Sequence, residues 1–236
     1  MNTRLLTLLG SVSFLALAGC SSSHVAVAPC CASREAASCP ECAGRPGVAE
    51  ISGAAVTETL LATPLFPPEA RPTLTLEHRV TTQDGTVTTL QRLLDRPAAI
   101  SFAYSRCTNP NKCPRVISAM GALRGELERA GLLGRVRLLV ISYDPEHDSP
   151  AELRTFAKLN GLRLDDQALF LQPECDPQHR LFRDLGVAAS FNDNGVAIHG
   201  IQLLLLDKQG RLARGFHTLL WDEQQVLSDL KQLAAE

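Results

Sequence analysis

Residues Tyr104-Ser-Arg-Cys-Thr-Asn-Pro-Asn-Lys-Cys-Pro114 contain two cysteines, Cys107 and Cys113, with five residues between them. The apolar run 98–104 before them has the length of a buried strand, and the pattern from Pro114 to Ala130 predicts a helix. Cys113 therefore stands at or next to a helix start, where free N–H groups and the helix dipole favour a thiolate. The pattern predicts a reactive or metal-binding Cys113. The alternative is a structural disulfide that closes a surface loop.

The chain on both sides of this stretch alternates between strand and helix patterns. Ser149, Pro150 and Glu152 form a capping box that opens a helix ending near Asn160-Gly161. The other predicted strands are 74–80, 86–89, 135–142, 168–171, 196–206 and 211–216. The other predicted helical segments are a single turn at 90–94, a helix from Asp176 to Gly186 and a final helix from Trp221. Turns are predicted at 83–85, 191–195 and 207–210. This order predicts an α/β fold with a central mixed sheet flanked by helices, antiparallel at the final hairpin.

The N-terminal segment predicts export. Residues 1–19 combine Arg4 with an apolar core too short to span a bilayer comfortably, as a signal peptide does. Leu17-Ala-Gly-Cys20 resembles the lipobox of bacterial lipoproteins, in which the cysteine becomes the acylated N-terminus. The alternative is an ordinary signal peptide followed by an unmodified Cys20. We expect a lipid-anchored protein of the bacterial cell envelope that lies outside the cytoplasm or faces the periplasm, and Ser21 is compatible with an outer-membrane location.

A tether is predicted from residue 20 to residue 68, followed by a folded domain over 69–236. The tether is rich in Ala, Ser, Gly and Pro and has too few large apolar residues to offset the entropy of ordering. Its remaining cysteines either supply soft ligands for Cu(I) or Zn(II) or form disulfides near the anchor. These cysteines are Cys30, Cys31, Cys39 and Cys42.

Charge and cysteine count narrow the functions further. The formal net charge of −2 gives no basic field, so nucleic-acid binding is not expected. With Cys20 set aside, seven of the eight cysteines remain. An odd number outside the cytosol leaves at least one thiol unpaired, metal-bound or paired between chains. Cys175 is either a third thiol partner or a partly buried inert cysteine.

Three separated blocks resemble the Sco/SenC family of membrane-tethered copper-binding factors. They are Phe102–Pro114, Ile141–Pro150 and His199–Arg211. Over about Thr73 to Leu233, the resemblance implies a thioredoxin-like fold and a role in assembling the copper site of cytochrome c oxidase. It also implies a copper site made of Cys107, Cys113 and His199, with a cytochrome c oxidase subunit as the copper-accepting partner and the lipid membrane as the anchor.

The chemistry of these three residues agrees with that implication. Two thiolates favour Cu(I) and an imidazole tolerates Cu(II), so one site can hold either oxidation state. Two features depart from the family pattern. The family usually places three residues between its cysteines, whereas this chain has five, 108–112, and Ile198 stands where an acidic residue often precedes the histidine.

Two further functions remain open from the sequence. In a thiol-disulfide oxidoreductase, either Cys107 or Cys113 would attack a partner's disulfide and the other would resolve the mixed disulfide. Against this, no proline follows Pro177, whereas thioredoxin-type enzymes carry one opposite their cysteine pair. Peroxide reduction at a thiolate would use Arg106 and Thr108, but the prolines that usually frame such sites are missing. Asp144 and Asp148 are interpreted as capping and solvated carboxylates rather than as ligands.

Overall fold

The computed structural model describes residues 65–176, 179–192, 195–218 and 221–236. The strands are β1 (Arg79–Thr82), β2 (Val87–Thr89), β3 (Ala98–Ala103), β4 (Arg137–Ser142), β5 (Ala168–Pro173), β6 (Ala189–Asn192), β7 (Gly195–His199), β8 (Leu203–Leu206) and β9 (Leu212–Phe216). The helices are α2 (Cys113–Arg129), α3 (Pro150–Leu159), α4 (Arg180–Asp184) and α5 (Glu223–Ala235), with 3-10 turns η2 (Pro68–Ala70) and η3 (Gln91–Leu93).

Seven of these strands form one mixed sheet, in the order β2-β1-β5-β4-β3-β8-β9. Strands β3, β4 and β5 are parallel, because α2 and α3 carry the chain across between them, and the outer pairs are antiparallel. All six residues of β3 are buried, which explains why its sequence reads as a continuous apolar run. The predicted α/β fold with a mixed sheet flanked by helices is therefore confirmed.

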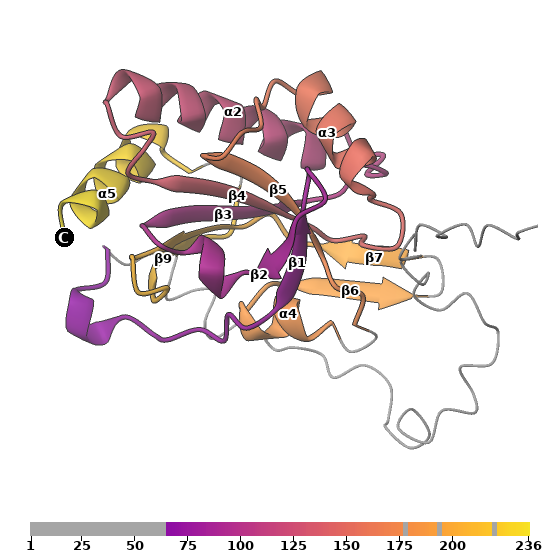
Figure 1. The fold of residues 1–236 in the computed structure, drawn as a ribbon, viewed down its shortest axis with the longest axis horizontal. Helices are drawn as coiled ribbons and strands as arrows, with labels where there is room; N and C mark the ends of the chain where they lie inside the picture. Colours follow the sequence, from indigo (N-terminus) through magenta and orange to yellow (C-terminus); the bar gives the residue numbers. More distant parts are fainter. Residues whose placement is uncertain (1–64, 177–178, 193–194, 219–220) are drawn as a thin grey trace, which may run out of the picture.

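Two hydrophobic cores lie on the two faces of this sheet (Figure 1). Helices α2, α3 and α5 cover one face, where Met120 of α2 and Leu230 of α5 are fully buried. The short helix α4 and the segment around η3 cover the other face, where Phe102 of β3 packs against Phe182 of α4. Because β3 contributes side chains to both cores, its carboxyl end is held from both sides.

The packing of α2 against the end of α3 depends on a glycine. A Cβ atom at Gly121 would lie 2.5 Å from the backbone oxygen of Gly161, so only a residue without a side chain fits there. Gly161 itself has φ +82°, as expected of a glycine that ends a helix. The predicted capping box of α3 is present: the Ser149 hydroxyl accepts from the Glu152 N–H, and Glu152 accepts from the Ser149 N–H.

The first predicted strand is wrong over most of its length. The sequence predicted a strand over 74–80, but β1 begins at Arg79. The oxygens of Leu76 and His78 accept from Gln91 and Leu90 around η3 instead of from a neighbouring strand. The alternation of buried and exposed residues in this segment therefore reflects an extended chain lying on the core.

The predicted strand over 196–206 divides into two strands of different sheets. Its first part, β7, pairs only with β6 in a two-stranded sheet, whereas β8 belongs to the main sheet. Between them, Gln202 is buried and bonds through its side chain to Gly186 and Ala188, which turns the chain. The sequence did not predict β6. Residues 189–192 are half-buried or exposed, so no periodic apolar pattern marks them.

The helix predicted from Asp176 is also shorter than expected. It begins at Arg180, because His179 adopts a left-handed conformation with φ 47° and stands outside the helical geometry. The final helix begins as predicted, with the Asp222 carboxylate accepting from the N–H groups of Gln224 and Gln225. Within the described part of the chain, no helix has the length and apolar character that crossing a membrane requires.

Candidate metal centre

The Cys107–Cys113 loop leaves the carboxyl end of β3 and leads directly into α2. Lys112 stands at the N-cap position, Cys113 is the first helical residue and Pro114 is the second. The extra loop residues fold into a compact turn, in which the Lys112 N–H donates to the Asn109 backbone oxygen at 3.1 Å. The Asn111 N–H donates to the Asn109 side chain at 2.9 Å. This turn brings the two cysteines back together despite the five residues between them.

Asp148 fixes the start of this loop, a role that the sequence analysis missed. Its carboxylate accepts from the Ser105 N–H at 3.1 Å, from the Ser105 hydroxyl, and from the Ser142 hydroxyl at 2.5 Å. The interpretation of Asp148 as a solvated carboxylate is wrong, since the residue is fully buried. Burial raises the pKa of Asp148, and the hydrogen bonds from the serines only partly offset this effect.

The sequence analysis interpreted Asp144 in the same way, but this carboxylate is also buried and has partners for its oxygens. It accepts from Arg106 at 2.7 Å and lies 2.8 Å from the Nδ1 atom of His147. It is therefore not solvated as the sequence analysis expected. Its oxygens are occupied by these neighbours, and Asp144 is not part of the group of residues placed to hold a metal ion.

His199 reaches the cysteines from the β6–β7 hairpin, which projects at the same end of the main sheet (Figure 1). It is the last residue of β7, and the following N–H, of Gly200, donates to the Ala188 oxygen at 2.9 Å. Gln202 then anchors the chain to β3, because its backbone oxygen accepts from the Ser101 hydroxyl at 2.7 Å. These bonds place His199 over the loop.

Cys107, Cys113 and His199 converge in space. The Nε2 atom of His199 lies 3.6 Å from the Cys107 sulfur and 3.4 Å from the Cys113 sulfur, and all three donor atoms lie within 4.8 Å of one another. Both cysteines are free thiols, so the alternative of a disulfide closing the loop is not the state found here. Cys113 is buried, whereas Cys107 is half-exposed, so the site opens on the Cys107 side.

The residues present fit a metal ion. The Nδ1 atom of His199 is buried and has no hydrogen-bond partner among the described residues, while Nε2 faces both sulfurs. The ring is oriented by packing against Tyr104 and Tyr143, whose centroids lie 5.2 and 5.3 Å from its own. Aromatic packing thus takes the place of the carboxylate that Ile198 does not supply. Two sulfurs and one imidazole nitrogen form a soft donor set that suits copper.

The electrostatics of the site keep the imidazole neutral. Burial, and then the positive charge of Lys112, lower the pKa of His199 to about 4, so its Nε2 is available to a metal at neutral pH. Burial also raises the pKa of Tyr104 to about 12, with further contributions from the two thiols. Neither the histidine nor this tyrosine carries charge near pH 7.

Cys113 differs from its predicted protonation. The helix start was expected to favour a thiolate, but burial raises the pKa of the Cys113 thiol and outweighs the backbone hydrogen bond of Tyr104, which lowers it. In the metal-free protein Cys113 is therefore a protonated, buried thiol. A bound metal ion would replace that proton, because only the thiolate is a metal ligand.

The remaining described histidines have other surroundings. His78 lies 3.1 Å from the Asp184 carboxylate, His179 stacks on Phe191, and His217 lies 2.9 Å from the Gln202 side chain. Cys175 is disulfide-bonded, and neither Cys107 nor Cys113 is its partner. It is therefore not a free third thiol.

Several predicted residues lie outside the described part of the chain. They are Cys20 with its predicted acyl anchor and the tether cysteines Cys30, Cys31, Cys39 and Cys42. The signal peptide of residues 1–19, Ser21 and most of the tether of residues 20–68 lie outside it as well.

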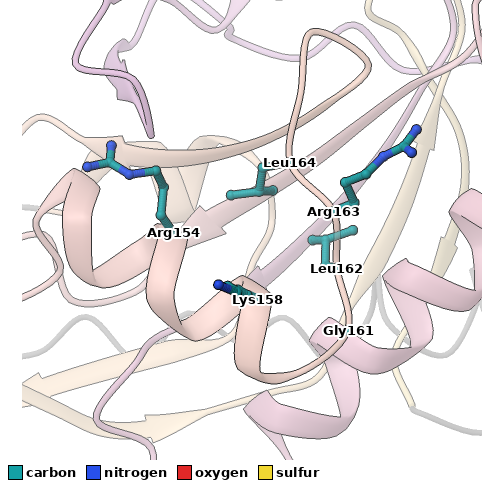
Figure 2. Close-up of a pocket in the computed structure, with 6 residues that line it drawn as sticks. All are labelled: Arg154, Lys158, Gly161, Leu162, Arg163 and Leu164. Carbon is teal, nitrogen blue, oxygen red and sulfur yellow. The ribbon is translucent and has the colours of Figure 1, made fainter.

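A larger groove of about 470 Å³ lies between α3 and the loop that follows it (Figure 2). Arg154 and Lys158 come from α3, Arg163 comes from the loop, and Leu162 and Leu164 lie between them. None of its lining residues is a cysteine, histidine or carboxylate. The groove thus provides no metal donors of these kinds.

The family model described as SCO1/SenC matches residues 67–235. This match covers more than half of the chain, so the chain belongs to the SCO1/SenC family, as the three sequence blocks implied. Among curated proteins, none matches this chain.

Solved structures of family members have the same fold. A SCO1/SenC family lipoprotein from Bacillus anthracis shares 21% identity at a TM-score of 0.63, over 74% of this chain and 99% of its own. BsSco, a member of the Sco family of cytochrome c oxidase assembly proteins, shares 20% identity at 0.61, over 73% and 98%. Bradyrhizobium japonicum ScoI with copper bound shares 24% identity at 0.51, over 68% and 99%. The predicted thioredoxin-like fold of this family is therefore confirmed.

Proposed function

We propose that this protein binds copper through Cys107, Cys113 and His199 and delivers it to the copper site of cytochrome c oxidase. The observation that carries the proposal is the convergence of two sulfurs and one imidazole nitrogen within 4.8 Å. Membership of the SCO1/SenC family and the copper bound in the Bradyrhizobium japonicum relative support the choice of metal.

The two oxidation states of copper call on different donors. The thiolates of Cys107 and Cys113 favour Cu(I), and the His199 imidazole allows Cu(II) to be held at the same place. The half-exposed Cys107 is the donor that an acceptor protein can reach, whereas the buried Cys113 keeps hold of the ion from inside. Copper would therefore leave on the Cys107 side.

The location of this activity follows from the N-terminal sequence. We propose that Cys20 is acylated, that the tether of residues 20–68 lets the domain of residues 69–236 move relative to the membrane, and that the protein faces outside the cytoplasm. Several acyl chains give durable membrane anchoring, whereas a single chain does not. An acceptor in the same membrane is then within reach of the domain.

Copper titration of the reduced full-length chain in detergent tests this proposal. Cys107→Ser, Cys113→Ser and His199→Ala should each abolish the sulfur-to-Cu(II) absorption band and weaken copper binding by more than about 100-fold, since loss even of outer residues costs about 10–100-fold. Cys42→Ser, in the tether, is the matched control and should retain the band. Tight copper binding in His199→Ala that persists when Cys30, Cys31, Cys39 and Cys42 are also replaced by Ser would contradict the proposed ligand set.

Thiol-disulfide exchange is the second candidate function, and the unequal exposure of the two free thiols favours it. The Cys107 thiolate would attack a partner's disulfide and release one partner thiolate, and Cys113 would then displace the second. The products are a Cys107–Cys113 disulfide and a partner with two thiols. Because this chemistry does not need His199, rapid disulfide turnover that survives His199→Ala, without copper binding, would favour this function.

A further inference from the structure

The open side of the metal centre is a groove of about 210 Å³. Cys107 and His199, two of the three proposed ligands, line it, whereas the buried Cys113 does not. Tyr104 and the β7 residues 196–198 complete its walls together with the loop residues Thr108, Asn109 and Lys112. An exogenous group in this groove would therefore lie next to two donors of the copper site.

Lys112 gives this groove a positive charge. It is the only charged residue among those that line it. Its ammonium nitrogen lies 3.5 Å from the His199 backbone oxygen, and among the described residues no carboxylate pairs with it. Thr108 and Asn109 add polar side chains to the same wall.

The number of donors leaves room for one more ligand in only one oxidation state. Cu(II) favours tetragonal geometry, which needs a fourth ligand besides the two thiolates and the imidazole. The charge balance of the site also favours an additional ligand only in the Cu(II) state. Cu(I) with two thiolates carries −1, which the +1 of Lys112 balances. Cu(II) with two thiolates is neutral, so the charge of Lys112 remains unbalanced until an anion enters.

We infer that the groove beside Cys107 is a binding site for a small anion, held by Lys112, that occupies the fourth position of Cu(II). The inference rests on the proposed copper binding and adds an anion-dependent control of it. When one electron from a one-electron donor reduces Cu(II) to Cu(I), the anion leaves as a free ion and no proton moves. Three of the five loop residues, Thr108, Asn109 and Lys112, line the groove that would hold the anion.

Azide titration of the Cu(II)-loaded full-length protein tests the inference. Azide should produce an azide-to-copper absorption band while the sulfur-to-copper band persists. Lys112→Met should bind Cu(II) with the same stoichiometry but weaken azide binding by about tenfold, because a charge-assisted hydrogen bond is lost. Lys112→Arg should bind azide nearly as well as the wild type. Lys158→Met, at an exposed lysine on α3, is the matched control and should not change azide binding.

Titration with neutral imidazole separates the effect of the Lys112 charge from the effect of access to the copper ion. Its affinity for the Cu(II) form should change less than about twofold in Lys112→Met, because no ion pair with Lys112 is lost. The copper reduction potential should also fall by about 59 mV for each tenfold rise of azide above its dissociation constant in the wild type.

The outcomes distinguish this inference from the proposed function. If the chain binds no copper through Cys107, Cys113 and His199, both fail. If copper binds but azide affinity is the same in Lys112→Met, or azide removes the sulfur-to-copper band, only the anion site fails.

Discussion

The two ends of β3 hold polar groups in opposite ways. At its amino end, beyond Leu206 of the neighbouring β8, Asp207 and Arg71 form an ion pair whose side chains are 1% and 0% exposed. Arg71 also pairs with Glu236 at 2.6 Å, and Arg211 donates to Asp207 at 2.8 Å. Burial alone would raise the pKa of Asp207, but the bonds from Arg211 and Arg71 outweigh it and lower that pKa.

At its carboxyl end, the donor atoms of the metal centre face one another instead, with the Nε2 atom of His199 3.6 Å from the Cys107 sulfur and 3.4 Å from the Cys113 sulfur. The Nδ1 atom of His199 is buried and unpaired within the described residues, and burial raises the pKa of the Cys113 thiol. A buried polar group that lacks a partner destabilises the fold. The charged groups at the amino end are thus satisfied by the chain itself, whereas the donor atoms at the carboxyl end are placed to hold a metal ion. This difference marks the functional end of the sheet.

Removing Arg71 should have the largest effect on stability. Arg71→Met removes one of the two guanidinium partners of the buried Asp207 and the partner of Glu236. Because Arg211 still pairs with Asp207, we expect the free energy of unfolding to fall by about 3 kcal/mol, the lower end of the range for a broken buried ion pair. Urea unfolding of the metal-free protein measures this change. The matched control is Arg79→Met, which breaks a pair with Glu174 whose side chains are 62% and 60% exposed and should cost about 1 kcal/mol or less.

The copper affinity of Arg71→Met provides a second measurement, because the ion pairs at the amino end of β3 should be independent of the metal centre. Arg71→Met should keep the copper affinity of the wild type within about twofold, as expected for distant sites. A large loss of copper affinity in a folded Arg71→Met protein would show that the two ends are coupled.

Asp148→Ala should combine a smaller loss of stability with a loss of binding. The Ser105 N–H and the Ser142 hydroxyl lose their acceptor, so we expect a loss of about 2–3 kcal/mol in the free energy of unfolding. Copper affinity should fall by roughly tenfold, because Ser105 no longer fixes the start of the Cys107 loop. Asp148→Asn keeps one acceptor oxygen and should lose less of both. Unchanged copper affinity in Asp148→Ala would mean that the loop is positioned without this carboxylate.

The pH dependence of copper binding tests the protonation of the metal centre without a substitution. Cu(I) displaces the proton of Cys113, whose pKa is raised by burial, and this exchange by itself should increase the apparent affinity by about tenfold per pH unit between about pH 6 and 8. His199, whose pKa is lowered to about 4, is neutral throughout this range and adds no further step. Competition with a Cu(I) chelator at several pH values measures the slope. A flat profile would show that Cys113 is already a thiolate in the free protein.

The helices and strands that flank the metal centre could be predicted from the sequence because the signals that specify them lie within a few neighbouring residues. The apolar run of β3, the proline at the start of α2 and the capping box of α3 each act within a few residues. The beginning of β1 and the division of 196–206 could not be predicted in this way. In both cases hydrogen bonds to distant residues, Gln91 for Leu76 and Ala188 for Gly200, override an apolar pattern that is compatible with a strand.

The sequence by itself determined the α/β order of elements, the presence of two cysteines at the start of a helix and, through resemblance to the family, the choice of His199. Only the tertiary structure decided how these residues meet. His199 comes from a hairpin outside the main sheet, Asp148 is buried beneath the loop, and Cys113 is protonated. These features depend on contacts between residues far apart in the chain and on the burial that those contacts produce. The spacing of neighbouring residues specifies neither the contacts nor the burial.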